Sequence, residues 1–127
     1  MSKTFIFHES IDVERINDLY ADDYQMIEEV FASVYDELTP LTDAVIACYT
    51  AGDVPALKSA VHKIKPLFGF VGITAIEGLC LDFENTCQKN PSAALLENEF
   101  TLLKDSLLSG KTILAEEKRK LRSFLQS

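Results

Sequence analysis

One histidine of this chain has neighbours that suit it to nucleophilic chemistry. His62 lies in a stretch of helical apolar spacing, and Lys58, Lys65 and Gly69 share its stripe, about 100° around the helix from the apolar one. An ordinary imidazole has a pKa of about 6.5, so at pH 7 most of it is neutral and nucleophilic. The two ammonium groups suit an incoming phosphoryl group, and Gly69 removes a side chain that would block an approaching partner. The pattern is that of a histidine phosphorylated by a docked protein.

Spacing alone favours a simpler interpretation, in which His62 is a boundary histidine hydrogen-bonded to a neighbour and the lysines form a solvated face. The only other histidine, His8, lies near the chain start, and the three cysteines (Cys48, Cys80 and Cys87) have no CxxC spacing. We therefore expect no metal site. We expect the cysteines to be buried free thiols in a reducing cytoplasm.

A longer motif around His62 resembles the histidine-containing phosphotransfer (HPt) domain family. That family has a lysine three residues after its histidine, a glycine ten residues after it, then an apolar residue and an apolar–Glu pair. Lys65, Gly72, Ile76 and Phe83–Glu84 stand at these spacings. With this resemblance, a phosphorylated His62 becomes the preferred interpretation over the boundary histidine that spacing alone favours.

The resemblance implies a chemical role for three residues. His62 would accept and donate a phosphoryl group through its outward ring nitrogen, Nε2. Lys65 would neutralise charge on the phosphoryl oxygens. Glu84, on the facing helix, would hydrogen-bond the other ring nitrogen and so fix the tautomer.

Five further residues are expected to shape the docking of a receiver domain and the geometry of the site: Lys58, Pro66, Gly69, Phe70 and Gly72. Gly72 should end the helix that carries His62, Gly69 should keep the docking surface low, and Phe70 should be exposed on it. Pro66 stands where the family usually has glycine. Because proline cannot donate to the carbonyl of His62, we predict a kink there.

The apolar pattern predicts the helices that must position these residues. A short acidic helix over 10–20 would begin at Ser10 as its N-cap. Apolar residues at steps of three or four from 27 to 48 predict one long helix that continues across Pro40, kinked or briefly broken there. Gly52 should end it, and Asp53 should cap the next helix, whose apolar stripe runs from 57 to 71.

Two more helices follow, each with an expected start signal. Thr74 and Glu77 have the spacing of a capping box. Asn90–Pro91 would be the N-cap and first residue of the last helix, whose heptad steps run from 96 to 124. Gly110 stands at one of its apolar positions and marks either a close helix contact or a bend.

These elements predict an all-α fold. It is an up-and-down antiparallel four-helix bundle over about 22–125, with an additional short N-terminal helix over about 10–20. The whole chain, 1–127, would be one domain. Thr4–Phe7 is the one stretch whose alternation allows a strand.

Composition limits the classes of partner. The net charge of −8 argues against nucleic acid and anionic membranes. This charge belongs to the first segment, since residues 1–50 carry two basic and eleven acidic residues (net −9) and residues 51–127 carry ten and nine (net +1). The chain has neither an apolar run of membrane-spanning length nor a secretory h-region, so we expect a cytoplasmic protein.

The leading hypothesis is a phosphorelay intermediate in two-component signalling. His62 would take a phosphoryl group from a receiver-domain aspartate and pass it to another receiver, the partners being receivers of a hybrid sensor kinase, of response regulators, or of both. The sequence has no glycine-rich nucleotide loop, so we expect a carrier and not a kinase. We also expect the protein to be a monomer. No cofactor is expected in this chain, and Mg²⁺ would belong to the receiver.

Two other functions fit parts of the pattern. A non-catalytic helical interaction module would bind a signalling partner without phosphotransfer, and Pro66 favours it. The dimerisation domain of a histidine kinase carries an acidic residue directly after its histidine. His62 is followed by Lys63, and His8–Glu9 lies too near the chain start to sit inside a helical hairpin.

Overall fold

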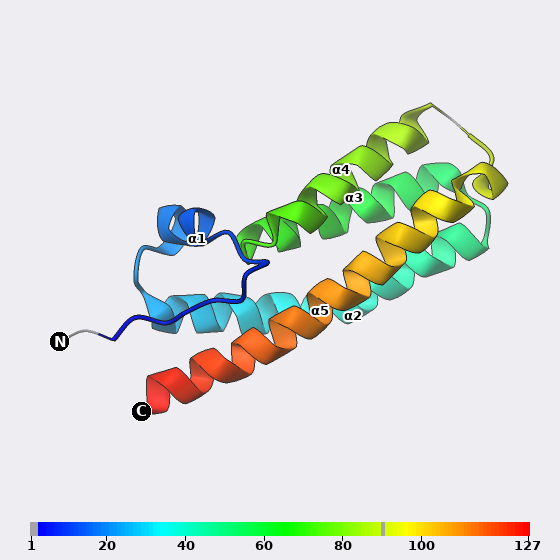
Figure 1. Ribbon diagram of the computed structural model, residues 1–127. Helices are drawn as coiled ribbons and strands as arrows, with labels where there is room; N and C mark the ends of the chain where they lie inside the picture. Colours follow the sequence, from blue (N-terminus) through cyan, green and yellow to red (C-terminus); the bar gives the residue numbers. More distant parts are fainter. Residues whose placement is uncertain (1–2, 90) are drawn as a thin grey trace.

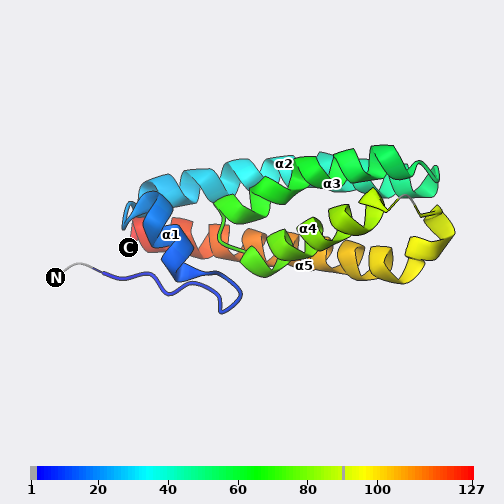
Figure 2. The ribbon, with the colours of Figure 1, turned by 90° about the horizontal axis from the view of Figure 1, so that it is seen from above.

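The computed structural model describes residues 3–89 and 91–127 and is built of helices (Figure 1). Its elements are α1 (Val13–Tyr20), α2 (Tyr24–Thr50), α3 (Val54–Phe70), α4 (Thr74–Gln88), a short 3₁₀ helix η1 (Ala93–Leu96) and α5 (Glu97–Gln126). Helices α2 to α5 run up and down beside one another as an antiparallel bundle, and α1 lies at one end (Figures 1 and 2). The predicted fold class is confirmed.

Aspartates start the first three helices, and glycines follow the second and third. The side chains of Asp12, Asp23 and Asp53 each accept a hydrogen bond from the backbone three residues on, at 3.2, 3.0 and 3.1 Å, which satisfies an otherwise unpaired amide at each N-terminus. Gly52 and Gly72 follow α2 and α3 with φ of 72° and 75°, a left-handed conformation that glycine adopts at little cost. The predictions for Gly52, Asp53 and Gly72 agree with these boundaries.

Two predicted N-caps are wrong. Helix α1 begins at Val13 behind Asp12, so Ser10 lies outside it. Thr74 is the first residue of α4, and its N-cap, Ile73, makes no side-chain capping bond. Glu77 forms an ion pair with Arg15 instead of closing a capping box, so a tertiary contact has replaced a local one.

The start of the last helix also differs from the prediction. Pro91 lies outside any helix, and the chain enters α5 through η1; the Asn90 part of that prediction lies outside the described residues. Thr4–Phe7 forms no strand, and no strand occurs anywhere else in residues 3–89 and 91–127. Its alternation places Phe5 inward and leaves Ile6 exposed.

Both internal prolines are contained within continuous helices. Helix α2 runs through Pro40, which agrees with one long helix and excludes a break, and α3 runs through Pro66 to Phe70.

Across residues 3–89 and 91–127, the structure has no helix with the length and apolarity needed to cross a bilayer.

Apolar faces of all five α-helices meet in one core. Its largest fully buried side chains come from every α-helix except α4, and Ile76, Cys80, Phe83 and Cys87 of α4 complete it. The cysteines are free; Cys80 and Cys87 are buried and Cys48 is half-buried. Burial, with the neighbouring Glu84 carboxylate, raises the pKa of Cys80 to about 12, so that thiol is inert at neutral pH.

Gly110 marks a close contact between helices. A Cβ atom there would lie 2.7 Å from Ile76 Cδ1 and 2.8 Å from Phe68 Cε1. The glycine therefore lets α5 approach α3 and α4, and this decides the question that the heptad pattern left open.

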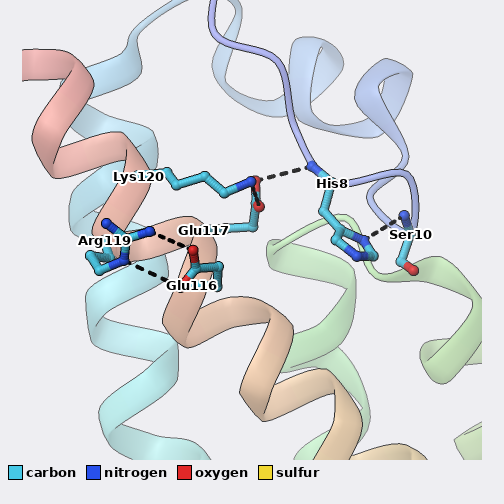
Figure 3. Close-up of polar contacts among 6 residues, drawn as sticks. All are labelled: His8, Ser10, Glu116, Glu117, Arg119 and Lys120. Atoms are coloured by element: carbon cyan, nitrogen blue, oxygen red, sulfur yellow. Dashed lines mark hydrogen bonds and ion pairs between the residues drawn. The ribbon is translucent and has the colours of Figure 1, made fainter.

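The N-terminal segment is held against α5 by a buried carboxylate that the sequence analysis missed (Figure 3). Glu117 is 0% exposed. Its Oε2 accepts a hydrogen bond from the His8 backbone at 3.0 Å, and its Oε1 lies 2.9 Å from Lys120 Nζ. Phe5 packs edge-on against Phe124, with ring centroids 5.5 Å apart. Charge and aromatic contacts thus fix the segment along the bundle.

Replacing Gly110 by alanine should destabilise the fold. Alanine gains helix propensity but forces the Phe68 ring and Ile76 to move, and overpacking of this kind costs about 1–3 kcal/mol. We expect a net loss of about 1 kcal/mol in the free energy of unfolding, measured by urea denaturation. Gly78→Ala is the matched control, because a Cβ there meets nothing within 4 Å, and it should be neutral or stabilising. Equal effects of the two variants would contradict the close-contact interpretation.

Replacing Glu117 by alanine should release the N-terminal segment. The His8 amide and the Lys120 ammonium would lose a buried partner, at a cost of about 2 kcal/mol. Hydrogen exchange should show faster exchange of the His8 amide than in the unmodified protein. Glu116→Ala removes an exposed pair with Arg119 on the same turn and should leave that exchange unchanged.

Candidate functional site

His62 projects from α3 toward solvent while one ring nitrogen is held by α4. Its side chain is 69% exposed, and its Nδ1 lies 2.7 Å from Oε1 of Glu84. A carboxylate only accepts hydrogen bonds, so the shared proton belongs to Nδ1. In the neutral ring this leaves the lone pair on Nε2, the nitrogen that Glu84 does not engage.

Glu84 is the buried centre of this group. Its side chain is 8% exposed, and its Oε2 lies 2.6 Å from Lys65 Nζ. Burial alone would raise the pKa of Glu84, but the hydrogen bonds and positive charges of Lys65 and His62 outweigh burial and lower it. The carboxylate is therefore ionised at neutral pH and holds both partners.

Helices α3 and α4 form an open depression beside the imidazole. It is lined by Lys58, Ser59, His62, Lys63, Leu81, Glu84, Asn85 and Gln88. Lys58 donates to the side-chain oxygen of Gln88 one turn before His62, and Lys63 is exposed. Two ammonium groups therefore border the depression, while that of Lys65 lies against Glu84.

Two of the five residues expected to shape docking and site geometry are buried. Gly69 is buried, and a Cβ there would lie 2.2 Å from Glu77 Oε2 and 3.2 Å from an Arg15 guanidinium nitrogen. The expectation that Gly69 keeps a partner-facing surface low is therefore wrong, because Gly69 makes room for the ion pair between α1 and α4. Gly72 is also buried, and its carbonyl accepts from the Asp12 backbone at 2.7 Å.

The exposed end of α3 carries Pro66 and Phe70. Phe70 is 48% exposed, and its backbone carbonyl accepts a hydrogen bond from the Tyr20 hydroxyl at 2.7 Å. Burial raises the pKa of Tyr20, which keeps this donor protonated. Tyr20 thus attaches α1 to the end of the helix that carries His62, while Arg15 attaches α1 to Glu77 of α4. The sequence analysis missed both residues, because their partners lie far away in the sequence.

The sequence profile of the Hpt domain family matches residues 25–109, a span that contains His62, Lys65 and Glu84. The chain belongs to the Hpt domain family. Hpt domains are phosphotransfer carriers of two-component systems, and they interact with receiver domains.

A solved structure supports the Hpt fold independently. The crystal structure of the HPT domain from an Hpt sensor hybrid histidine kinase of Shewanella superposes with a TM-score of 0.72 and 16% identity, covering 84% of this chain and 92% of that one. At this identity the likeness concerns the fold. A search of curated proteins gives no match.

The arrangement in this Hpt domain suits a nucleophilic histidine. An exposed Nε2 carries the lone pair, and a buried carboxylate holds the opposite nitrogen and can balance positive charge on the ring. The ammonium groups of Lys58 and Lys63 border the same depression as the imidazole and can attract an anion there. The position of the ring proton, the exposure of the imidazole and the nearby positive charges all favour Nε2 as the nucleophilic atom.

Stability should depend on pH through Glu84. Its folded-state pKa lies below the unfolded value of about 4.3, so the stabilisation is complete above that value and is lost as pH falls through the folded pKa. We expect Glu84→Gln to be less stable than the unmodified protein at pH 7, with the difference shrinking below about pH 4. Urea unfolding from pH 7 to pH 3 measures it. Glu116→Gln, in an exposed pair, is the control and should show no such difference at moderate salt; a pH-independent gap for Glu84→Gln would contradict the assignment.

Proposed function

We propose that this Hpt domain is a phosphorelay intermediate. It takes a phosphoryl group from the aspartyl phosphate of a receiver domain onto His62 and passes it to another receiver. The observation that carries the proposal is the 2.7 Å contact between His62 Nδ1 and Glu84, which assigns the lone pair to the exposed Nε2.

The transfer needs little chemistry from the chain beyond positioning. The Nε2 lone pair forms a bond to phosphorus, the acyl phosphate P–O bond breaks, and the receiver carboxylate leaves with that electron pair. The ring then carries a positive charge, which the Glu84 carboxylate balances through the proton that stays on Nδ1. The reverse step, on a second receiver, regenerates the same His62 tautomer.

The lysines supply charge in this scheme. Lys58 borders the open depression, and its half-buried side chain could exchange its hydrogen bond to Gln88 for one to a phosphoryl oxygen. Lys65 reaches the phosphoryl group only by releasing Glu84, so its first effect is to hold that carboxylate ionised. The Mg²⁺ of the reaction would be bound by the receiver, and the carrier would act as a cytoplasmic monomer without kinase activity of its own.

Labelling by a phosphorylated receiver tests the proposal. Receiver domains are phosphorylated with labelled acetyl phosphate, freed of excess donor and mixed with the protein. We expect an acid-labile, alkali-stable label on the unmodified chain and none on His62→Gln. His8→Gln is the matched control, because His8 is the only other histidine, and it should label normally.

Each other outcome has a definite meaning. A label that survives His62→Gln, or the absence of label with every receiver tried, would overturn the proposal. A stable receiver complex that never transfers the group would establish the binding module instead.

A further inference from the structure

A row of cations follows one flank of α5. Lys104, Lys111, Lys118 and Arg122 succeed one another at steps of seven, seven and four residues, and such steps keep side chains on one side of an α-helix. At 1.5 Å per residue this basic row is about 27 Å long. None of its members has a part in the transfer scheme at His62.

Two cations of the basic row converge on an aromatic ring of α2. The Nζ atoms of Lys111 and Lys118 lie 5.5 and 4.8 Å from the centroid of the Tyr35 ring, and Lys111 also donates to the Thr39 hydroxyl. The ring and the hydroxyl attract an ammonium group but carry no negative charge. Neither lysine forms an ion pair with any of residues 3–89 and 91–127. Both positive charges are therefore left for an anion from outside the chain.

A shallow recess opens beside this ring. It is lined by Tyr35, Ala115, Lys118, Arg119 and Arg122. Arg119 and Arg122 each pair with a carboxylate of this chain, on Glu116 and Glu28. Ammonium and guanidinium groups only donate hydrogen bonds, and a phenol hydroxyl can donate as well. The lining therefore suits a ligand that offers acceptors, such as carboxylate groups.

Negative charge around the basic row limits the size of that ligand. Glu29, Asp36 and Asp43 are exposed on one face of α2, and residues 1–50 carry two basic and eleven acidic residues. A nucleic acid duplex or an anionic bilayer would extend beyond the row and meet this surface. An extended peptide of about eight residues, at about 3.3 Å each, matches the length of the row.

The basic row and His62 lie on different pairs of helices. Figures 1 and 2 show α3 beside α4 on one side of the bundle and α2 beside α5 on the other. His62 contacts Glu84 between α3 and α4, whereas Lys111 and Lys118 meet Tyr35 between α5 and α2. A partner on the basic row therefore leaves the imidazole free.

We propose that the basic row and Tyr35 bind a short acidic segment of a partner protein. Carboxylates of the segment pair with Lys111 and Lys118, and its backbone follows the seam between α2 and α5. This partner is bound at the same time as a protein at His62, so the seam tethers the chain. The inference stands on charge and geometry and does not depend on phosphotransfer.

Binding of a synthetic peptide to the full chain tests the proposal. The probe is an octapeptide of alternating glutamate and serine, and the same peptide with glutamine for glutamate is its neutral counterpart. In amide NMR spectra we expect the acidic peptide to shift Tyr35 and residues 104–122 and to leave His62 unchanged. The affinity should fall as salt rises from about 0.05 to about 0.3 M, because the charges are exposed to solvent. The neutral peptide should not bind.

A pair of charge reversals locates the site. Lys118→Glu should weaken binding of the acidic peptide about fivefold or more. Lys89→Glu changes the net charge equally at an exposed position after α4, and it should stay within twofold of the unmodified chain. Lys111→Gln is the second variant of the row and should also weaken binding. Melting temperatures close to that of the unmodified chain show that the variants fold.

Each other outcome overturns the proposal. Equal weakening by Lys118→Glu and Lys89→Glu would show attraction to net charge alone. Shifts centred on His62, or no saturable binding of the acidic peptide, would remove the site from the seam. Tighter binding of a single-stranded oligonucleotide or of phosphatidylserine vesicles would replace the acidic segment by that ligand. Labelling of His62 is measured separately, so its failure would overturn the proposed function and leave the tethering site in place.

Discussion

The carboxylate of Glu84 is the constraint on which the site depends. A buried charge is costly unless each oxygen has a partner, and here one oxygen meets His62 and the other Lys65. Both partners come from α3 and the carboxylate from α4, so the core must fix the register of these two helices. That register follows from the buried stripes through Ile64 and Phe68 on α3 and Cys80 and Phe83 on α4. The core packing that sets the register of α3 and α4 therefore also places Glu84 against His62 and Lys65.

The same helix pair is fixed at its other end by α1. Gly69 lacks a Cβ atom that would collide with Glu77, and a Cβ atom at Gly72 would crowd Ile11 and Ile16 at 3.0–3.1 Å. The Tyr20 hydroxyl donates a hydrogen bond to a carbonyl of the last turn of α3. The end of α3 is thus covered by a segment about fifty residues earlier in the chain. This cover leaves Phe70 exposed while its backbone is held, and it leaves the His62 side chain open to solvent.

The limits of the sequence analysis follow from the range of the interactions involved. Helical periodicity is local, and it predicted the five α-helices and the continuity of α2 across Pro40. Asp53 and Gly52 were predictable because a cap is made within three or four residues. The capping box at Thr74 failed because Arg15, 62 residues away, binds Glu77. Gly69 was misread for the same reason, and Glu117 could not be identified as buried without knowing that the His8 backbone returns to α5. The grouping of His62, Lys65 and Glu84 was reached through the resemblance, since spacing alone left His62 ambiguous.

Pro66 shows why a departure from the usual pattern can leave the site intact. A proline inside a helix removes the hydrogen bond to the carbonyl four residues back, here that of His62. Both residues are exposed, so water can satisfy that carbonyl and the loss is not a buried unsatisfied group. The contact with Glu84 is made by the imidazole side chain across to α4, so it does not depend on the backbone hydrogen bond that Pro66 removes. The proline therefore costs helix stability in the last turns of α3 but leaves the position of Nδ1 to the core and to Glu84.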